Sequence, residues 1–264
     1  MNKEPIILMR SHLAELNEVY ECSKHFDVTN LRTECQNKLV IGRYSCLPYY
    51  RELEQDLHNL DSVLINNYEQ HRWIADFEWC NALSYYTPET WFDCNFCDCS
   101  YEGPFVVKGA TNSKKLLWDT HMFARTKRDA MIMATKLQQD SIIGGQDIVY
   151  RRYVPLKTFE IGLNGLPFTN EWRAFCYKDT LLSIGYYWSM ADNVDYDVTD
   201  GALELIDELM QIACNYANFY VLDIAETVDG NWILIEVNDG QQSGLSENDP
   251  KVLYSNLGEA LIGF

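Results

Sequence analysis

Residues 219–240 read FYVLDIAETVDGNWILIEVNDG, and this stretch decides how the chain folds. Two alternating apolar segments flank Asp229-Gly230, a dipeptide that supplies the positive φ angles of a tight hairpin turn. A loop centred on this dipeptide sets the register of the whole hairpin. The expected cross-strand pairs are Val228 with Asn231, Leu222 with Val237, Ile224 with Ile235, and Asp223 with Glu236.

The two faces of this predicted hairpin differ in character because side chains alternate along a strand. One face carries Leu222, Ile224, Ile233, Ile235 and Val237, and the other carries Asp223, Glu236 and Asn238. Like charges directly opposite one another are destabilising, so the acidic face calls for a compensating group. Carboxylate and amide oxygens suit a hard divalent cation. The alternative is a hairpin with one solvated acidic face, which is common in antiparallel sheets.

The composition is that of an acidic globular protein. The 264 residues are 47% hydrophobic and 13% aromatic, enough for a substantial core in one domain or two. The 39 Asp and Glu outnumber the 21 Lys and Arg and give a net charge of −18, which argues against broad attraction to nucleic acid or membrane. No run of about 18 apolar residues and no signal-like segment occurs, so we expect a cytoplasmic protein with its nine cysteines reduced.

Three cysteines crowd together as Cys94, Cys97 and Cys99 in FDCNFCDCS. Such spacing is compatible with part of a zinc site, but no fourth ligand lies nearby, since the nearest histidines in the sequence are His71 and His121. We expect ordinary buried or loop thiols here.

The first hundred residues alternate predicted strands and helices. We expect a strand through Val40-Ile41, a helix from Pro48 to about Leu60, a strand over 62–65 and a helix over 69–80. This repetition predicts a small α/β unit. A segment rich in Thr, Pro, Cys, Asp and Gly over 85–102 marks a boundary, which we place near residue 101.

A second unit follows, in which Lys108 ends the apolar strand Phe105-Val106-Val107. The polar loop after it carries Lys114 and Lys115, an arrangement that suits phosphate binding, although GxxxxGK[ST] is absent. The alternative for Lys108 is a surface lysine. Thr126 is expected to cap a helix to about 139, and IVYRRYVPL to form a strand that ends at Pro155.

A further hairpin is expected over 169–188, with Arg173 in the middle of its first strand beside aromatic residues. An arginine there is costly to bury without an anionic partner, so it faces either solvent or phosphate. Helices are expected over about 201–217, with Asp200 as its cap, and over 252–264.

The segments VVKGATNSKKLLW, IVYRRYVPL, GLPFTNEWRAF and IEVNDGQQSGL, in this order, resemble the ATP-grasp superfamily. They are most similar to its largely phage-associated clade named for one arginine and two lysines. The resemblance implies an α+β fold in which two lobes grip ATP after a small α/β domain. The implied divisions are 1–100 for the first domain, 101–156 for the small lobe and 157–264 for the large lobe.

The resemblance also implies roles for individual residues. Lys108 and Lys115 would contact phosphates from the small lobe, and Arg173 from the large lobe. The implied Mg²⁺ ligands are Asp223, Glu236 and Asn238, the set found on the acidic face of the hairpin. Adenine would lie against the strand end Tyr150, Arg151, Arg152 and Tyr153. This chain departs from the family at Arg152, where an acidic residue is frequent, and at Asn112, where a lysine is frequent.

The implied activity is an ATP- and Mg²⁺-dependent carboxylate–amine ligase that works through an acyl phosphate and releases ADP and phosphate. Its partners would be a carboxylate and an amine or other nucleophile on a small molecule, peptide or protein, in the host cytoplasm if a phage encodes it. The first domain and the loop over 239–245 would bind the acceptor. The alternatives are a kinase or nucleotide- or nucleic-acid-modifying enzyme, and a non-catalytic nucleotide-binding module, since a fold alone does not decide function.

Overall fold

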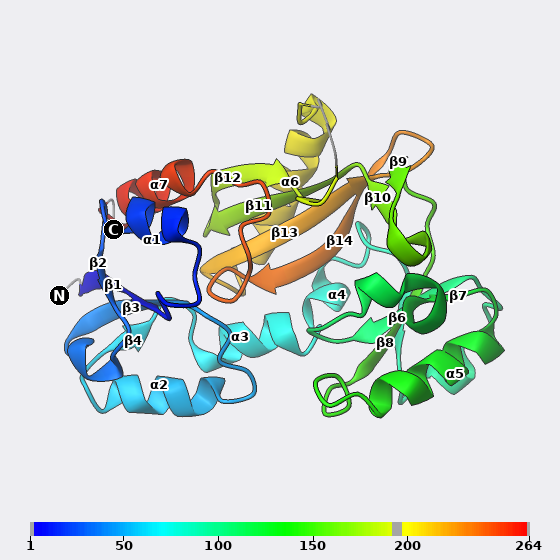
Figure 1. Cartoon of the computed structure of the whole chain (residues 1–264), viewed down its shortest axis with the longest axis horizontal. Helices are drawn as coiled ribbons and strands as arrows, with labels where there is room; N and C mark the ends of the chain where they lie inside the picture. Colours follow the sequence, from blue (N-terminus) through cyan, green and yellow to red (C-terminus); the bar gives the residue numbers. More distant parts are fainter. Residues whose placement is uncertain (1–2, 192–196, 263–264) are drawn as a thin grey trace.

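The computed structural model describes residues 3–191 and 197–262, and Figure 1 shows how their elements are arranged. In these ranges the strands form three four-stranded sheets and one two-stranded ribbon. Each of the larger sheets takes its strands from one segment of the chain, and helices lie against them. This arrangement confirms the α+β class predicted from the sequence.

The first sheet is parallel and has the strand order β2-β1-β3-β4. Its elements are β1 (Glu4–Met9), α1 (Leu16–Cys22), β2 (Asp27–Thr29), β3 (Lys38–Arg43), α2 (Tyr50–His58), β4 (Val63–Leu64) and α3 (Tyr68–Ala75). Ile6 and Val40 pack with α2 on one face, whereas Ile7 and Ile41 on the other face join the core of the third sheet. The predicted strands and the first helix are confirmed. The helix expected over 69–80 ends at Ala75, because Phe77 has a φ of 63°, and α4 (Trp79–Ala82) follows as a separate turn.

The second sheet is antiparallel and has the order β5-β8-β6-β7. Its elements are β5 (Thr90–Phe92), β6 (Phe105–Gly109), β7 (Phe123–Ala124), α5 (Lys127–Gln138) and β8 (Ile148–Arg152). Between β6 and β7 lie the short helical turns η3 (Lys115–Leu117) and η4 (Trp118–Met122). The hydroxyl of Thr126 accepts a hydrogen bond from the Asp129 N–H and caps α5, as predicted. The strand expected to reach Pro155 ends at Arg152.

The third sheet, of order β12-β11-β13-β14, holds the largest core. Its elements are β11 (Glu171–Tyr177), β12 (Thr180–Tyr186), α6 (Asp200–Ala213), β13 (Phe219–Glu226), β14 (Trp232–Asp239) and α7 (Pro250–Ile262), preceded by the ribbon of β9 (Thr158–Ile161) and β10 (Pro167–Thr169). Alternation along β13 sends Leu222 and Ile224 toward α6, and Phe219 and Val221 toward α7 and the first sheet. The side chain of Thr199, rather than the expected Asp200, caps α6.

The register of the β13–β14 hairpin differs from the prediction near its turn. Thr227, not Val228, faces Asn231 across a loop that contains Gly230 at a φ of 82°. Ile224 therefore pairs with Leu234, not with Ile235.

An irregularity at Ile235 then shifts the register back by one residue, so that Leu222 faces Val237 and Asp223 faces Glu236, as predicted. The predicted apolar face is wrong at Ile233 and Ile235, because Leu234 takes their place in the core. Both isoleucines line a cleft instead.

The division of the chain at 101 and 157 into three units stays our proposal. Strand β5 lies before residue 101 but pairs with β8, so this part of the segment over 85–102 belongs to the second sheet. None of the helices in the described ranges has both the length and the apolar character to span a bilayer.

Candidate functional site

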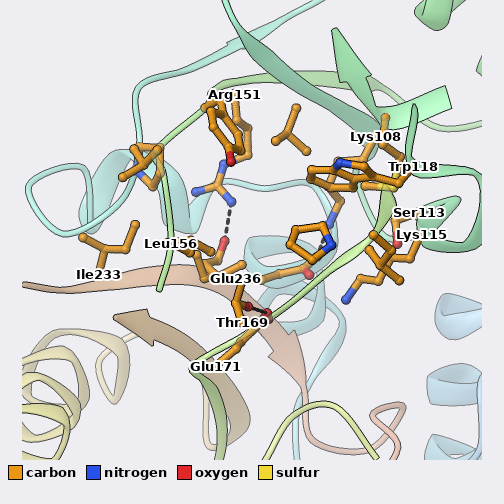
Figure 2. Close-up of a pocket in the computed structure, with 18 of the residues that line it drawn as sticks. Lys108, Ser113, Lys115, Trp118, Arg151, Leu156, Thr169, Glu171, Ile233 and Glu236 are labelled. Carbon is orange, nitrogen blue, oxygen red and sulfur yellow. Dashed lines mark hydrogen bonds and ion pairs between the residues drawn. The ribbon is translucent and has the colours of Figure 1, made fainter. Parts of the chain in front are cut away.

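A cleft separates the second sheet from the third, and its walls come from β6, β8, β11 and β14 (Figure 2). We call it the main cleft. Its apolar part is formed by residues such as Val106, Trp118, Met122, Leu156, Ile233 and Ile235. Charged side chains lie at one end, where Lys108, Lys115 and Glu236 surround the same space. An apolar cleft that leads to clustered cations suits a ligand with an aromatic ring and an anionic tail.

A second, more polar space of about 710 Å³ adjoins the main cleft at these charged side chains. We call it the cation cavity. Lys108, Lys115, Arg173, Glu236 and Asn238 line it, together with the loop residues 111–114 and 242–244. The tertiary structure therefore brings together residues from three separate predicted segments, although Arg173 is far in the sequence from the two lysines.

Lys108 and Glu236 form a largely buried ion pair between β6 and β14. Burial alone would raise the pKa of Glu236, but the charge of Lys108, assisted by Lys115 and Arg151, holds it below its usual range. Burial lowers the pKa of Lys108 although Glu236 opposes this shift. The cations around Glu236 outnumber it, so this end of the cleft is electrostatically prepared for a further anion.

Arg173 and Asp223 form a second buried pair, between β11 and β13. Arg173 Nε is 2.8 Å from Asp223 Oδ1, and its Nη2 is 2.8 Å from Oδ2, which is a bidentate geometry. Burial acts to lower the pKa of Arg173, but Asp223 more than offsets this effect and raises it. Arg173 therefore does not face solvent, and its partner in this structure is the carboxylate that opposes Glu236 across the hairpin.

The repulsion expected between Asp223 and Glu236 is thus compensated by two cations of the chain itself. Asn238 joins the group, because its Nδ2 donates to Asp223 Oδ2 at 3.0 Å. Among the described residues, neither Asn238 Oδ1 nor the second oxygen of Glu236 has a hydrogen-bond partner. These free oxygens suit Mg²⁺, which commonly uses one or two carboxylates and completes its shell with phosphates and water. Both oxygens of Asp223 are held by Arg173 and Asn238, so Asp223 would join them only if Arg173 turned to another anion.

No group of three His, Cys, Asp or Glu side chains in residues 3–191 and 197–262 is placed to hold a metal ion. The candidate Mg²⁺ set has only two carboxylates and would depend on ligand oxygens. In the cysteine cluster, Cys94 and Cys97 are exposed, while Cys99 is buried and donates to the Tyr101 carbonyl. The expectation of ordinary thiols stays a prediction.

Lys115 lies in η3 and reaches across the cleft to the third sheet. Its Nζ contacts the Tyr187 hydroxyl and lies 4.0 Å from the centre of the Tyr187 ring and 5.1 Å from that of Trp188. Burial acts to lower its pKa, but Tyr187 and the nearby Glu171 raise it. Lys115 is therefore held in its charged form against the rings of Tyr187 and Trp188.

Glu171 is a residue of the cleft that sequence reasoning missed. It is buried, lines the main cleft and accepts a hydrogen bond from the Thr169 hydroxyl at 3.2 Å. Burial raises its pKa to about 7, although Lys115 opposes this shift. The available signal was its spacing, because Glu171 stands two residues before Arg173 in β11 and shares its face.

The strand end expected to receive adenine offers fewer free side chains and backbone donors to a ligand than the sequence suggested. Tyr150 stacks on Phe96 at 3.7 Å and donates to Asp93, on the side of the sheet away from the main cleft. The backbone N–H groups of Arg152 and Tyr153 already donate to carbonyls of the protein.

The Arg151 side chain is also engaged. It donates to the Ile235 carbonyl and the Thr87 hydroxyl, which ties β8 to β14. Val154 follows β8 and lines the cleft, and its backbone N–H has no partner in the described ranges.

Comparison with known proteins identifies a family that matches this chain. Residues 97–257 match the model of an ATP-grasp domain family, the third family of the clade named for one arginine and two lysines. No curated protein sequence matches the chain.

Several solved structures share the fold over nearly the whole chain. D-alanine–D-alanine ligase from Bacillus anthracis complexed with ATP is 12% identical, with a TM-score of 0.60 over 100% of this chain and 98% of that one. D-cycloserine synthetase DcsG is 11% identical, with a TM-score of 0.61 over 97% and 99%. The ATP-grasp ligase PsnB complexed with a minimal precursor is 10% identical, with a TM-score of 0.57 over 100% and 99%. At such identities the likeness concerns the fold alone.

Proposed function

This chain belongs to the third ATP-grasp domain family of the clade named for one arginine and two lysines, and from that membership we propose that it is an ATP- and Mg²⁺-dependent carboxylate–amine ligase. The observation that carries the proposal is the convergence of Lys108, Lys115 and Arg173 on one cavity that Glu236 and Asn238 also line. Asp223 is buried behind this lining and is hydrogen-bonded to Arg173 and Asn238. The ATP-grasp neighbours support it, because the proteins with this fold include ligases.

In this proposal the base of ATP occupies the apolar part of the main cleft, and its phosphates enter the cation cavity. Lys108 and Lys115 would bind phosphate oxygens from the second sheet, and Arg173 from the third. The two ion pairs of the chain would then exchange partners: the cations turn to phosphate, and the carboxylates become free. Asp223, Glu236 and Asn238 would hold Mg²⁺, which supplies charge neutralisation and alignment of the phosphates.

The chemistry follows from this positioning. The substrate carboxylate attacks the terminal phosphorus of ATP, the bond to ADP breaks, and an acyl phosphate forms. The cationic side chains stabilise the negative charge that spreads over the phosphoryl oxygens. An amine then attacks the acyl carbon, forms the C–N bond and displaces phosphate.

The acceptor would enter beside the loop over 240–244. A space of about 330 Å³ opens there between Arg10 and Tyr44 of the first domain and Gln242 of the loop. Arg43 anchors this loop, because it donates to the carbonyls of Gly240 and Ser243. The acceptor would be a small molecule, peptide or protein; PsnB, named with its precursor, is a neighbour with a peptide partner.

The net charge of −18 argues against nucleic acid and membrane as partners. The proposal places the protein in the cytoplasm, of the host cell if a phage encodes it, and its nine free cysteines support this location.

The first experiment is thermal unfolding with ATP, ADP or GTP, each with Mg²⁺ and with EDTA. ATP at about 100 times its Kd should add about 2.7 kcal/mol of stability, and only with Mg²⁺. Lys115→Met should abolish the shift, whereas Lys136→Met, which changes an exposed lysine of α5, should retain it. No nucleotide-dependent shift in the wild type would refute the proposal.

Product analysis then separates ligase from kinase. A ligase yields an amide with ADP and phosphate, while a kinase leaves a stable phosphorylated product and no free phosphate.

A further inference from the structure

His71 is a buried histidine of α3 with only 4% of its surface exposed. Its Nδ1 lies 2.9 Å from Asp239 Oδ2, and its ring stacks on Tyr50 with centroids 3.8 Å apart and planes 1° apart. Helix α3 lies against the end of β14, the strand that carries Glu236 and Asn238 (Figure 1). The contact therefore holds an imidazole rigidly beside the candidate Mg²⁺ and phosphate site.

The hydrogen bonds of Asp239 determine which imidazole nitrogen carries the proton. Asp239 Oδ1 accepts from Asn66 Nδ2 at 3.1 Å and from the Gln241 N–H at 2.9 Å, while Oδ2 faces His71. A carboxylate with both oxygens occupied as acceptors requires a donor at Nδ1. Gln242 Nε2 lies 3.3 Å from the same nitrogen, a longer contact that is weaker than the one to the charged carboxylate. In the neutral form, His71 therefore carries its proton on Nδ1 and its lone pair on Nε2.

Nε2 is accessible rather than sealed in the core. It has no hydrogen-bond partner in the described ranges, where the single fully buried and unpaired side-chain polar atom is Trp79 Nε1. His71 lines a side pocket of about 190 Å³. This side pocket shares the following residues with the cation cavity: Thr111, Asn112, Asn238, Gln242 and Ser243. The residue that carries this unpaired imidazole nitrogen thus lines a space that adjoins the cation cavity, where the phosphates are proposed to bind.

We propose that His71, oriented by Asp239, accepts the proton from the attacking amine. This inference rests on the ligase function proposed above. The amine nitrogen attacks the acyl carbon and forms the C–N bond, and the C–O bond to phosphate breaks with its electron pair passing to phosphate. The proton that the nitrogen loses passes to His71 Nε2.

The titratable groups next to His71 do not compete with its imidazole for the proton. From α2, Tyr50 faces the ring, and burial raises its pKa well above the usual range. Burial likewise raises the pKa of Cys46, which interacts with Asp239 from the loop before α2, to about 12. Both groups stay neutral at physiological pH, and in the part of the chain that the structure describes Asp239 is the acidic residue in contact with His71.

The test compares His71→Asn with the wild type. Asparagine keeps an amide N–H for Asp239 but has no group that accepts a proton. His58→Asn, at an exposed histidine in the last turn of α2, is the matched control. The substrates are MgATP with a pool of common amino acids, which supply both carboxylates and amines. Hydroxylamine, which is largely unprotonated at neutral pH, serves as a second nucleophile that needs no base.

We expect His71→Asn to keep MgATP binding and hydroxamate formation but to lose about 10²–10⁴-fold in amide formation at pH 7. The loss should shrink at high pH, where free amine becomes abundant. Unchanged amide formation would overturn the inference. So would an equal loss with hydroxylamine, because it would assign His71 to the formation of the acyl phosphate.

Failure of the proposed function has a different signature, since the wild type itself would then form neither amide nor hydroxamate, and the inference would fall with it.

A further measurement needs no substrate. Long-range ¹H–¹⁵N spectra of the wild type, assigned with His71→Asn, should show His71 protonated at Nδ1 and not at Nε2. The opposite tautomer would overturn the inference.

Discussion

Replacement of Lys108 by methionine tests the ion pair at the centre of the cleft. The side chains of Lys108 and Glu236 are only 9% and 14% exposed, so the change leaves a carboxylate largely buried without its partner. Removing one member of a buried pair typically costs about 3–5 kcal/mol. Lys115 and Arg151 remain near Glu236, so we expect about 3 kcal/mol, which for a chain of this size lowers Tm by about 6–12 °C.

The loss of folding free energy caused by Lys108→Met should depend on pH in a defined direction. In the wild type the pKa of Glu236 is lowered, so its contribution to stability is present above its ordinary value of 4.5 and is lost as pH falls through the folded-state pKa. Without Lys108, burial raises the pKa instead, and the folded state gains a proton more readily than the unfolded chain. The difference between mutant and wild type should therefore be larger at pH 8 than at pH 5.

The assay is urea denaturation of the wild type, Lys108→Met, Glu236→Gln and the double mutant, at both pH values. The double mutant has no buried charge at this position and should recover most of the stability lost in Lys108→Met. A double mutant no more stable than Lys108→Met, or a cost that does not change with pH, would refute the reasoning.

Three further predictions concern the rest of the site. Glu236→Gln should weaken Mg²⁺-dependent nucleotide binding in calorimetry, and unchanged affinity with unchanged Mg²⁺ dependence would exclude a ligand role. Glu171 has its pKa raised from 4.5 to about 7, so the folded state holds its proton longer and wild-type stability should fall by about 2–3 kcal/mol between pH 5 and pH 8. Glu171→Gln should lack this decline in urea denaturation, and a parallel decline would contradict the assignment. EDTA without nucleotide should leave Tm unchanged, since a large drop would mean that metal binds at the cysteine cluster, Cys94, Cys97 and Cys99.

The β13–β14 hairpin shows which features a local sequence pattern predicts and which it does not. The prediction that Asp223 faces Glu236 is confirmed, although two of its premises are wrong. The turn shifts the register by one residue, and the irregularity at Ile235 shifts it back. A bulge depends on the packing of neighbouring strands, which a local sequence pattern does not contain.

Glu171 and His71 show a different limit. Glu171 could have been found from its spacing to Arg173, because strand periodicity places both on one face. His71 carries no such signal, since Asp239 is remote in sequence and reaches it through the packing of α3 on β14.

The sequence by itself determined the class of the fold, most of its longer strands and helices, and the identity of several charged residues that line the cavity, namely Lys108, Lys115, Arg173 and Glu236. These features depend on local periodicity, turn chemistry and residue type, which are all written along the chain. Only the tertiary structure decided how the charges are paired, with Lys108 on Glu236 and Arg173 on Asp223. Burial and the choice of partner depend on distances between remote segments. The raised pKa of Glu171 and the unpaired Nε2 of His71 therefore follow from packing and not from sequence order.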